Sequence, residues 1–385
     1  MNLLKVIKFK WLLLFSYLIT VIIAWSYGGS YIIYAASSIF LMCVTYFLIL
    51  RKSYCAFPVL KTICIILVLF TCFLGLLHGD IQSPLMVNTS LLLPIAIASL
   101  RIDTTNIQRQ LAYASILSVP IIMYIGIYIK EWNSNSLAFI FFGGVSLPFL
   151  WFKFSNRLFN KLLSGLLLLF FATYLLATGS RNAGIVLCIS IVLLLLPNSI
   201  YRNKILFRIL YLIPLFSTVF AESIMAFVFN TKSIIDNLVD FTAQYSQKAW
   251  GMDTHLYILL YVRDKFLNLD IFTQLFGSGV KAGHCHNIFY QCLFFYGFLG
   301  TVIIYMIYMR IFEYAYKLIY KYNDSLVLGC FIILLGHFYL QIGEVYMLGA
   351  ESANVISLLP VGIILQRLNY YKSHGNINSN SLLQT

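Results

Sequence analysis

The sequence predicts an all-helical protein that crosses a membrane many times. Of its 385 residues, 61% are hydrophobic and only 10% are charged, whereas a soluble domain is about a quarter charged. Apolar runs recur along most of the chain, and a run of roughly 20 residues spans a bilayer core of about 30 Å as a helix. So few charges could not cover a soluble fold, which excludes a soluble enzyme, a disordered protein and a nucleic-acid-binding protein.

Twelve apolar segments are predicted to be transmembrane helices. They are 10–28, 31–50, 60–78, 84–100, 111–129, 137–152, 161–178, 183–197, 205–228, 287–309, 326–342 and 353–367. Together they form a single transmembrane domain over residues 1–371, followed by a polar cytoplasmic tail at 372–385. The first segment simply starts the series, so no cleavable signal peptide is expected.

The basic residues indicate which side of the membrane each loop faces. When the loops are placed alternately on the two sides, 19 of the 26 Lys and Arg residues fall on one side. The positive-inside rule makes that side cytoplasmic and places both termini there. The net charge of +13 therefore reports topology. The expected partner is the lipid bilayer, and no nucleic acid is expected.

One outer loop, residues 229–286, is much longer than the others, and such loops are usually functional or disordered. Its segment 255–276 mixes aromatic and charged residues, so part of it is expected to be a helix along the membrane surface. Arg263 lies there beside Asp264 and Lys265. This group is either a solvated charge cluster or includes a phosphate contact.

A tight outer turn at 178–182 (TGSRN) joins two predicted spans and contains Ser180 and Arg181. An arginine there can extend its charged head to water. Alternatively, a guanidinium can hold a phosphate with two hydrogen bonds, and the first turn of the next helix adds N–H donors. The turn is therefore a candidate anion site.

The segment 284–287 (HCHN) enters the tenth predicted span. Imidazole is the natural general base near neutral pH, which makes His286 and His284 candidate catalytic residues. They could also be ordinary interfacial histidines, and Asn287 could be only a helix N-cap. Neighbouring residues rarely share one ion, so no metal is expected, and the eight cysteines show no disulfide pattern.

The eleventh span and its outer loop contain further ionisable residues. Such groups inside a membrane are functional candidates by default, and these include His337 and Glu344. Most lie near the outer boundary, where we expect water to solvate them.

Several motifs are missing from the sequence. It has no D-x-D motif for a metal-bound nucleotide sugar, no phosphate-binding loop for ATP and no G-x-S-x-G elbow. An enzyme of this type would therefore act without a cofactor on a donor that is already activated and is reached from the membrane.

The outer motifs resemble those of the O-antigen polymerase and O-antigen ligase superfamily. The matching stretches are 178–183 (TGSRNA), 286–289 (HNIF) and 296–300 (YGFLG). Their order also fits, because an arginine turn precedes a long periplasmic loop and a histidine at the next helix. A further family arginine lies in the loop before a G-x-G, which is similar to Arg263 and the stretch 277–279 (GSG) here, at a shorter spacing.

The resemblance implies a metal-independent membrane glycosyltransferase of the GT-C type. It would lie in the inner membrane of a Gram-negative bacterium and use undecaprenyl-diphosphate-linked oligosaccharide at the periplasmic face. By the same resemblance, His286 would activate the acceptor hydroxyl, and Arg181 would contact the donor diphosphate. A chain-length regulator protein would be a further partner.

Three functions stay open at this point. A polymerase transfers the glycan to another lipid-linked repeat unit, whereas a ligase transfers it to lipid A-core. The stretch 133–136 (NSNS) resembles one found more in polymerases, although a plain polar turn on the outer side explains it better. A transporter or lipid-linked oligosaccharide flippase is the alternative from another class, and such proteins usually show repeat symmetry or interrupted helix pairs. The two halves of this sequence show no similarity and its polar groups gather at the outer rim, which favours surface chemistry over transport.

Overall fold

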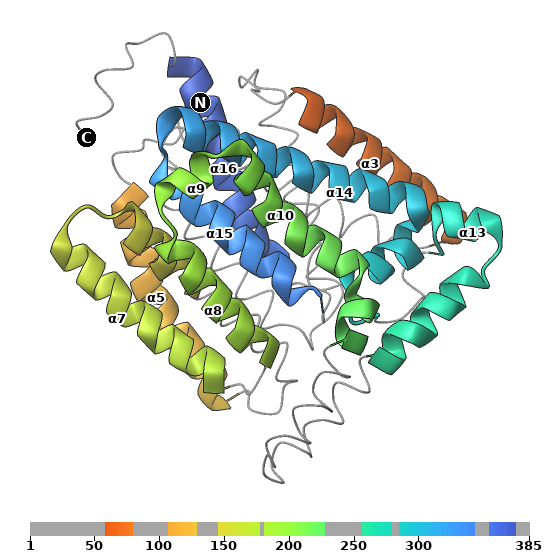
Figure 1. Ribbon diagram of the computed structural model, residues 1–385, viewed down its shortest axis with the longest axis horizontal. Coiled ribbons are helices and arrows are strands. Elements are labelled where there is room, and N and C mark those ends of the chain that lie inside the picture. Colours follow the sequence, from red (N-terminus) through yellow and green to blue (C-terminus); the bar gives the residue numbers. More distant parts are fainter. Residues whose placement is uncertain are drawn as a thin grey trace, which may run out of the picture.

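The computed structural model describes residues 58–79, 107–128, 145–177, 181–227, 256–278, 285–342 and 354–374. Every regular element in these ranges is a helix, which confirms the predicted all-helical class. The labelled helices are α3 (Pro58–His78), α5 (Ile107–Tyr128), α7 (Leu158–Ala177), α8 (Arg181–Leu195), α9 (Asn198–Arg202), α10 (Lys204–Val219), α13 (Ile271–Phe276), α14 (Ile288–Tyr322), α15 (Ser325–Leu340) and α16 (Asn354–His374) (Figure 1). Further helices are Val145–Phe154, Ala221–Phe227 and 256–267.

Three helices of the described part are long and apolar enough to cross a membrane, namely α3, α7 and α14. The bent pair of α10 and Ala221–Phe227 makes a fourth if it is one span. These helices support a membrane-embedded protein, while the total of twelve spans stays a prediction. The predicted spans 10–28, 31–50 and 84–100 lie outside the described residues.

The core of the bundle lies around α15, whose side chains are buried along nearly its whole length. A helix that is apolar on all sides is expected in the centre of a large bundle. Phe331 of α15 stacks on Phe207 of α10 with ring centroids 4.2 Å apart, and it meets Phe312 of α14 edge-on at 5.7 Å. Aromatic packing therefore joins these three helices.

The predicted span 205–228 is wrong as one straight helix. The chain bends by 85° between α10 and Ala221–Phe227. In an uninterrupted helix the carbonyl of Thr218 would accept from the N–H four residues later. Here it accepts from the Asn287 side chain at 3.0 Å. The side-chain amide of Asn287, far away in the sequence, therefore donates a hydrogen bond to a carbonyl at the end of α10.

The predicted span 287–309 also differs from the observed helix. α14 continues to Tyr322 and is broken at Gly297, where φ is +63°. The carbonyl of Phe294 lies one turn before this break and accepts hydrogen bonds from the Ser278 backbone N–H at 2.7 Å and from its hydroxyl at 3.0 Å. The end of the long loop thereby satisfies a carbonyl near the break.

Gly277, in the stretch 277–279 (GSG), and Gly297, in the stretch 296–300 (YGFLG), occupy positions that only glycine fits without strain. Both have positive φ, +86° and +63°, which glycine adopts without the steric cost of a side chain. A Cβ on Gly277 would lie 2.4 Å from the Phe295 carbonyl oxygen, and one on Gly297 would lie 2.3 Å from the Leu275 carbonyl carbon. The two glycines therefore let the backbone after α13 pack directly on the broken α14.

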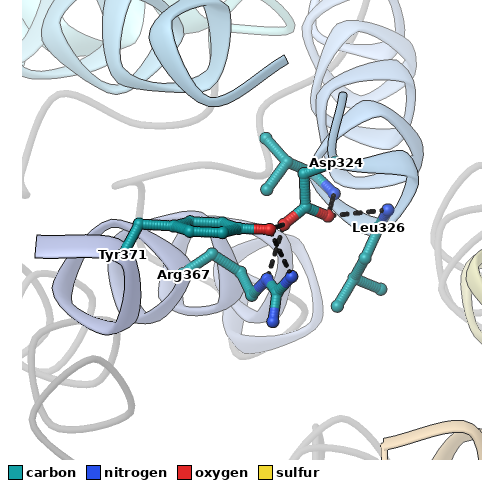
Figure 2. Close-up of polar contacts among 5 residues, drawn as sticks. Asp324, Leu326, Arg367 and Tyr371 are labelled. Carbon is teal, nitrogen blue, oxygen red and sulfur yellow. Dashed lines mark hydrogen bonds and ion pairs between the residues drawn. The ribbon is translucent and has the colours of Figure 1, made fainter. Parts of the chain in front are cut away.

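A buried polar group joins the start of α15 to the end of α16 (Figure 2). We call Asp324, Arg367 and Tyr371 the Asp324 clasp. One carboxylate oxygen of Asp324 accepts from the first N–H groups of α15, at 3.0 Å from Leu326 N and 3.1 Å from Val327 N. The other accepts from Arg367 Nε at 2.6 Å and from the Tyr371 hydroxyl at 3.0 Å. The carboxylate therefore has partners on both oxygens.

Candidate functional site

His286 immediately precedes the N-cap of α14 and is half-buried. Its φ is +51°, in the left-handed region that few non-glycine residues adopt. Such a conformation costs about 1–3 kcal/mol and persists only where the surroundings hold it, often at functional sites. The backbone geometry therefore supports a functional hypothesis for His286.

Asn287 is fully buried and is the N-cap of α14, as one of the two interpretations predicted. Its side-chain oxygen accepts from Phe289 N at 2.9 Å and from Tyr290 N at 3.1 Å. Its amide nitrogen donates to the carbonyls of Thr218 at 3.0 Å and Ile342 at 3.1 Å. This one side chain ties the end of α10 and the segment after α15 to the start of α14, and so positions its neighbour His286.

Arg263 lies on helix 256–267 and pairs with two carboxylates. Its Nη1 donates to Glu222 at 2.5 Å, and its Nε and Nη2 donate to one oxygen of Asp264 at 3.0 and 2.9 Å. Glu222 also shares a hydrogen bond with the Tyr290 hydroxyl. The hydrogen bond to Asp264 raises the pKa of Arg263, so the guanidinium stays charged. We call these four residues the Arg263 cluster.

The Arg263 cluster reaches the first turn of α14, which His286 and the N-cap Asn287 precede. Tyr290 belongs to the cluster and lies four residues after His286, about one helical turn along the chain. Residues 222, 263 and 290 come from three separate parts of the sequence, and the fold brings them together. The nearby Lys265 ammonium lies 5.8 Å from the centre of the Phe294 ring, so a second cation is present.

Sequence reasoning did not identify Glu222 or Tyr290 as site residues. A signal was present for Glu222, because it is an acidic residue at the end of an apolar segment. Tyr290 is one of many tyrosines near predicted membrane boundaries, and its spacing from His286 alone does not distinguish it. Their roles become visible only through Arg263.

The other predicted residues are placed in part. Arg181 begins α8, and its side chain lies outside the described part of the structure. α9 joins the end of α8 to the start of α10 at one side of the helix bundle. The start of α8, with Arg181, and the end of α10 therefore both lie toward the other side of the bundle (Figure 1). Ser180, His284 and Glu344 lie outside the described residues.

His337 lies in the last turn of α15 and is fully buried. The expectation that water solvates it is therefore wrong, because helices pack around α15 on all sides. The carbonyl of His337 accepts from the Gln341 side chain at 3.0 Å, which helps to end the helix. The structure gives His337 a place in the core, one helical turn before Gln341, whose carbonyl accepts from Ile288 N at 3.3 Å at the start of α14.

Cys285 is buried directly before His286. Burial raises the pKa of its thiol to about 12, so at neutral pH it is not a thiolate nucleophile. Within the described residues, no three His, Cys, Asp or Glu side chains lie close enough to hold a metal ion.

The described residues form an all-helical fold whose apolar helices indicate a membrane-embedded protein, with a polar cluster at the start of a broken helix. No protein-family model matches the chain, and no curated protein matches its sequence.

Proposed function

We propose that the chain is an O-antigen or related surface-polysaccharide polymerase, a membrane glycosyltransferase that acts at the periplasmic face of the inner membrane of a Gram-negative bacterium. The observation that carries the proposal is the Arg263 cluster, which includes Tyr290 in the first turn of α14, four residues after His286. An arginine for a phosphate and an imidazole for a hydroxyl are the groups that this transfer needs.

In the proposed reaction, a sugar hydroxyl of one lipid-linked repeat unit attacks the anomeric carbon of another glycan. His286 takes the hydroxyl proton, and undecaprenyl diphosphate leaves. Negative charge develops on the leaving diphosphate, so cationic groups stabilise the transition state. We assign this role to Arg263 and to Arg181 at the start of α8, where backbone N–H groups add donors. A single displacement inverts the anomeric centre.

Deleting the gene in its host tests this assignment by a lipopolysaccharide gel. Loss of a polymerase leaves core carrying a single repeat unit. Bare core with accumulated lipid-linked polymer would instead identify a ligase, which transfers the finished glycan to lipid A-core. An unchanged ladder in the deletion strain contradicts both transferase functions.

A transporter or flippase is the second candidate, because two helices are interrupted. The break at Gly297 in α14 and the 85° bend after α10 are the kind of discontinuity that transporters place at their binding sites. Reconstitution into liposomes separates the two functions. Movement of a fluorescent lipid-linked oligosaccharide across the bilayer without formation of polymer would favour transport, and polymer formation would favour the transferase.

A further inference from the structure

The hydrogen bonds of Arg263 leave part of its guanidinium for a ligand. An arginine side chain carries five N–H donors in a planar fork. Glu222 takes one of them, and Asp264 takes two on the Nε and Nη2 edge. That edge is one of those to which carboxylates and phosphates bind bidentately.

The two carboxylates around Arg263 differ in how they are held. The Glu222 side chain is 19% exposed, lies just after the 85° bend, and also bonds to Tyr290. The Asp264 side chain is 60% exposed, and its hydrogen bonds in the described part of the chain go to the neighbouring Arg263. Water can therefore take over from Arg263 as the partner of Asp264 more easily than as the partner of Glu222.

Glu222 and Asp264 both face Arg263, so two negative charges surround its single positive charge, and the nearby Lys265 offsets only the excess. A diphosphate would gain little attraction from this arrangement unless one carboxylate moves away. The exposed Asp264 is the one that can rotate into water. Its departure leaves Arg263 paired with Glu222 and opens the Nε and Nη2 edge.

We propose that Glu222 is a positioning residue that fixes the Arg263 guanidinium, and that Asp264 occupies its anion-binding edge until the donor diphosphate replaces it. The identity of the anion rests on the proposed function. No bond is made or broken covalently in this step, since one oxyanion replaces another on the same two N–H groups. Tyr290 holds Glu222 in place.

Two variants test the proposal because each removes one negative charge beside the same guanidinium. If charge alone mattered, Glu222→Gln and Asp264→Asn would both tighten the binding of an anion. We expect opposite effects instead. Asp264→Asn lowers the KM for the lipid-linked donor, and Glu222→Gln raises it by roughly tenfold, the size expected for one hydrogen bond to a charged group. A shift of both variants in the same direction overturns the proposal.

The chain contains a matched control at a second arginine. Glu313 accepts from Arg208 Nε at 2.8 Å and from the Tyr211 hydroxyl at 3.0 Å, and its side chain is 22% exposed. Glu313→Gln therefore removes a similar carboxylate from a similar arginine and tyrosine pair. We expect its thermal stability to fall about as much as that of Glu222→Gln, with the donor KM unchanged. An equal rise of KM in both variants means that lost stability explains the effect, and overturns the proposal.

Direct binding separates this inference from the proposed function. The probe is undecaprenyl diphosphate, added to the purified full-length protein in detergent. Tighter binding by Asp264→Asn and weaker binding by Glu222→Gln support the inference even if no polymer forms, in which case the polymerase assignment fails alone. Polymer formation with both variants shifted alike leaves the polymerase assignment and removes the inference.

If Glu222→Gln does not fold, Tyr290→Phe replaces it. We then expect weaker binding of undecaprenyl diphosphate, and unchanged binding would contradict the proposal.

Discussion

The Arg263 cluster and the Asp324 clasp are built from the same residue types and differ in their access to water. Each joins an arginine, a carboxylate and a tyrosine. Those of the Arg263 cluster lie on three helices, whereas Arg367 and Tyr371 both lie on α16 and Asp324 caps α15. The Asp324 side chain is 1% exposed, and its carboxylate accepts two backbone and two side-chain hydrogen bonds. Glu222 and Arg263 are far more accessible, and the Arg263 fork is only partly used. A buried polar group whose hydrogen bonds are all made within the protein stabilises the fold, whereas a group that water partly reaches can exchange its partners.

Their positions agree with this difference. Asp324 directly precedes α15, whereas Asn287, next to His286, contacts the carbonyl of Ile342 just beyond the other end of α15. The clasp and the candidate site therefore lie at opposite ends of the central helix. Changes at one end should affect stability, and changes at the other should affect activity.

The largest expected effect is on activity. His286→Ala removes the proposed base, and we expect polymer formation to fall by about a hundredfold to ten-thousandfold. Membrane insertion and thermal stability should stay close to those of the wild type. The matched control is His78→Ala, at the end of α3, which should keep its activity. Normal long-chain polysaccharide from His286→Ala would remove His286 from the mechanism.

Asp324→Asn should produce the largest loss of stability. Asparagine caps a helix about as well as aspartate, so the change mainly leaves the buried Arg367 charge without its counter-ion. Breaking a buried ion pair on one side costs about 3–5 kcal/mol. Denaturant or thermal unfolding in detergent measures this loss. A variant as stable as the wild type would show that water reaches the clasp and that the comparison with the Arg263 cluster fails.

Replacing each arginine by lysine sharpens the comparison further. Lysine keeps the charge and loses the planar fork. Arg263→Lys should lower kcat/KM for the lipid-linked donor by about tenfold, with little change in thermal stability. Arg367→Lys should lower the free energy of unfolding by about 1.5–3 kcal/mol, with activity close to wild type. The reverse assignment of the two effects would contradict the division into a binding end and a stabilising end.

The smallest expected effect is on the pH dependence of thermal stability. Asp270 caps α13 and accepts hydrogen bonds from the hydroxyl and N–H of Thr273, which lower the pKa of its carboxyl group. A lowered pKa stabilises the fold above the unfolded-state value, near 4, and this contribution is lost as the pH falls toward the folded-state pKa. Asp270→Asn should therefore unfold at a lower temperature than wild type near pH 6, with the difference shrinking toward about pH 3. A difference that grows in acid would contradict this account.

Several elements could be predicted from local sequence. The apolar run predicted as 60–78 is the helix Pro58–His78, and the amphipathic stretch 255–276 contains the helices 256–267 and Ile271–Phe276. Asn287 could be foreseen as an N-cap because its oxygen bonds to N–H groups two and three residues later. These features depend on residues that are close together in the chain.

The helix breaks and the partners of Arg263 could not be predicted in the same way. The bend after α10 lies where Asn287, 69 residues away, bonds to the Thr218 carbonyl, and the break in α14 is accompanied by bonds from Ser278 to Phe294, 16 residues away. Glu222 and Arg263 are 41 residues apart. Composition and spacing carry no information on such distant hydrogen bonds.

The sequence by itself determined that this is a helical membrane protein, because so few charges and such long apolar runs are compatible with a bilayer and not with water. It also singled out His286 and Arg263, since polar residues stand out against that background. Only the tertiary structure decided that Arg263 pairs with Glu222, and that Glu222 and Asp264 share one guanidinium unequally. The physical reason is that burial and hydrogen bonding depend on which helices meet, and that is settled by packing across the whole bundle.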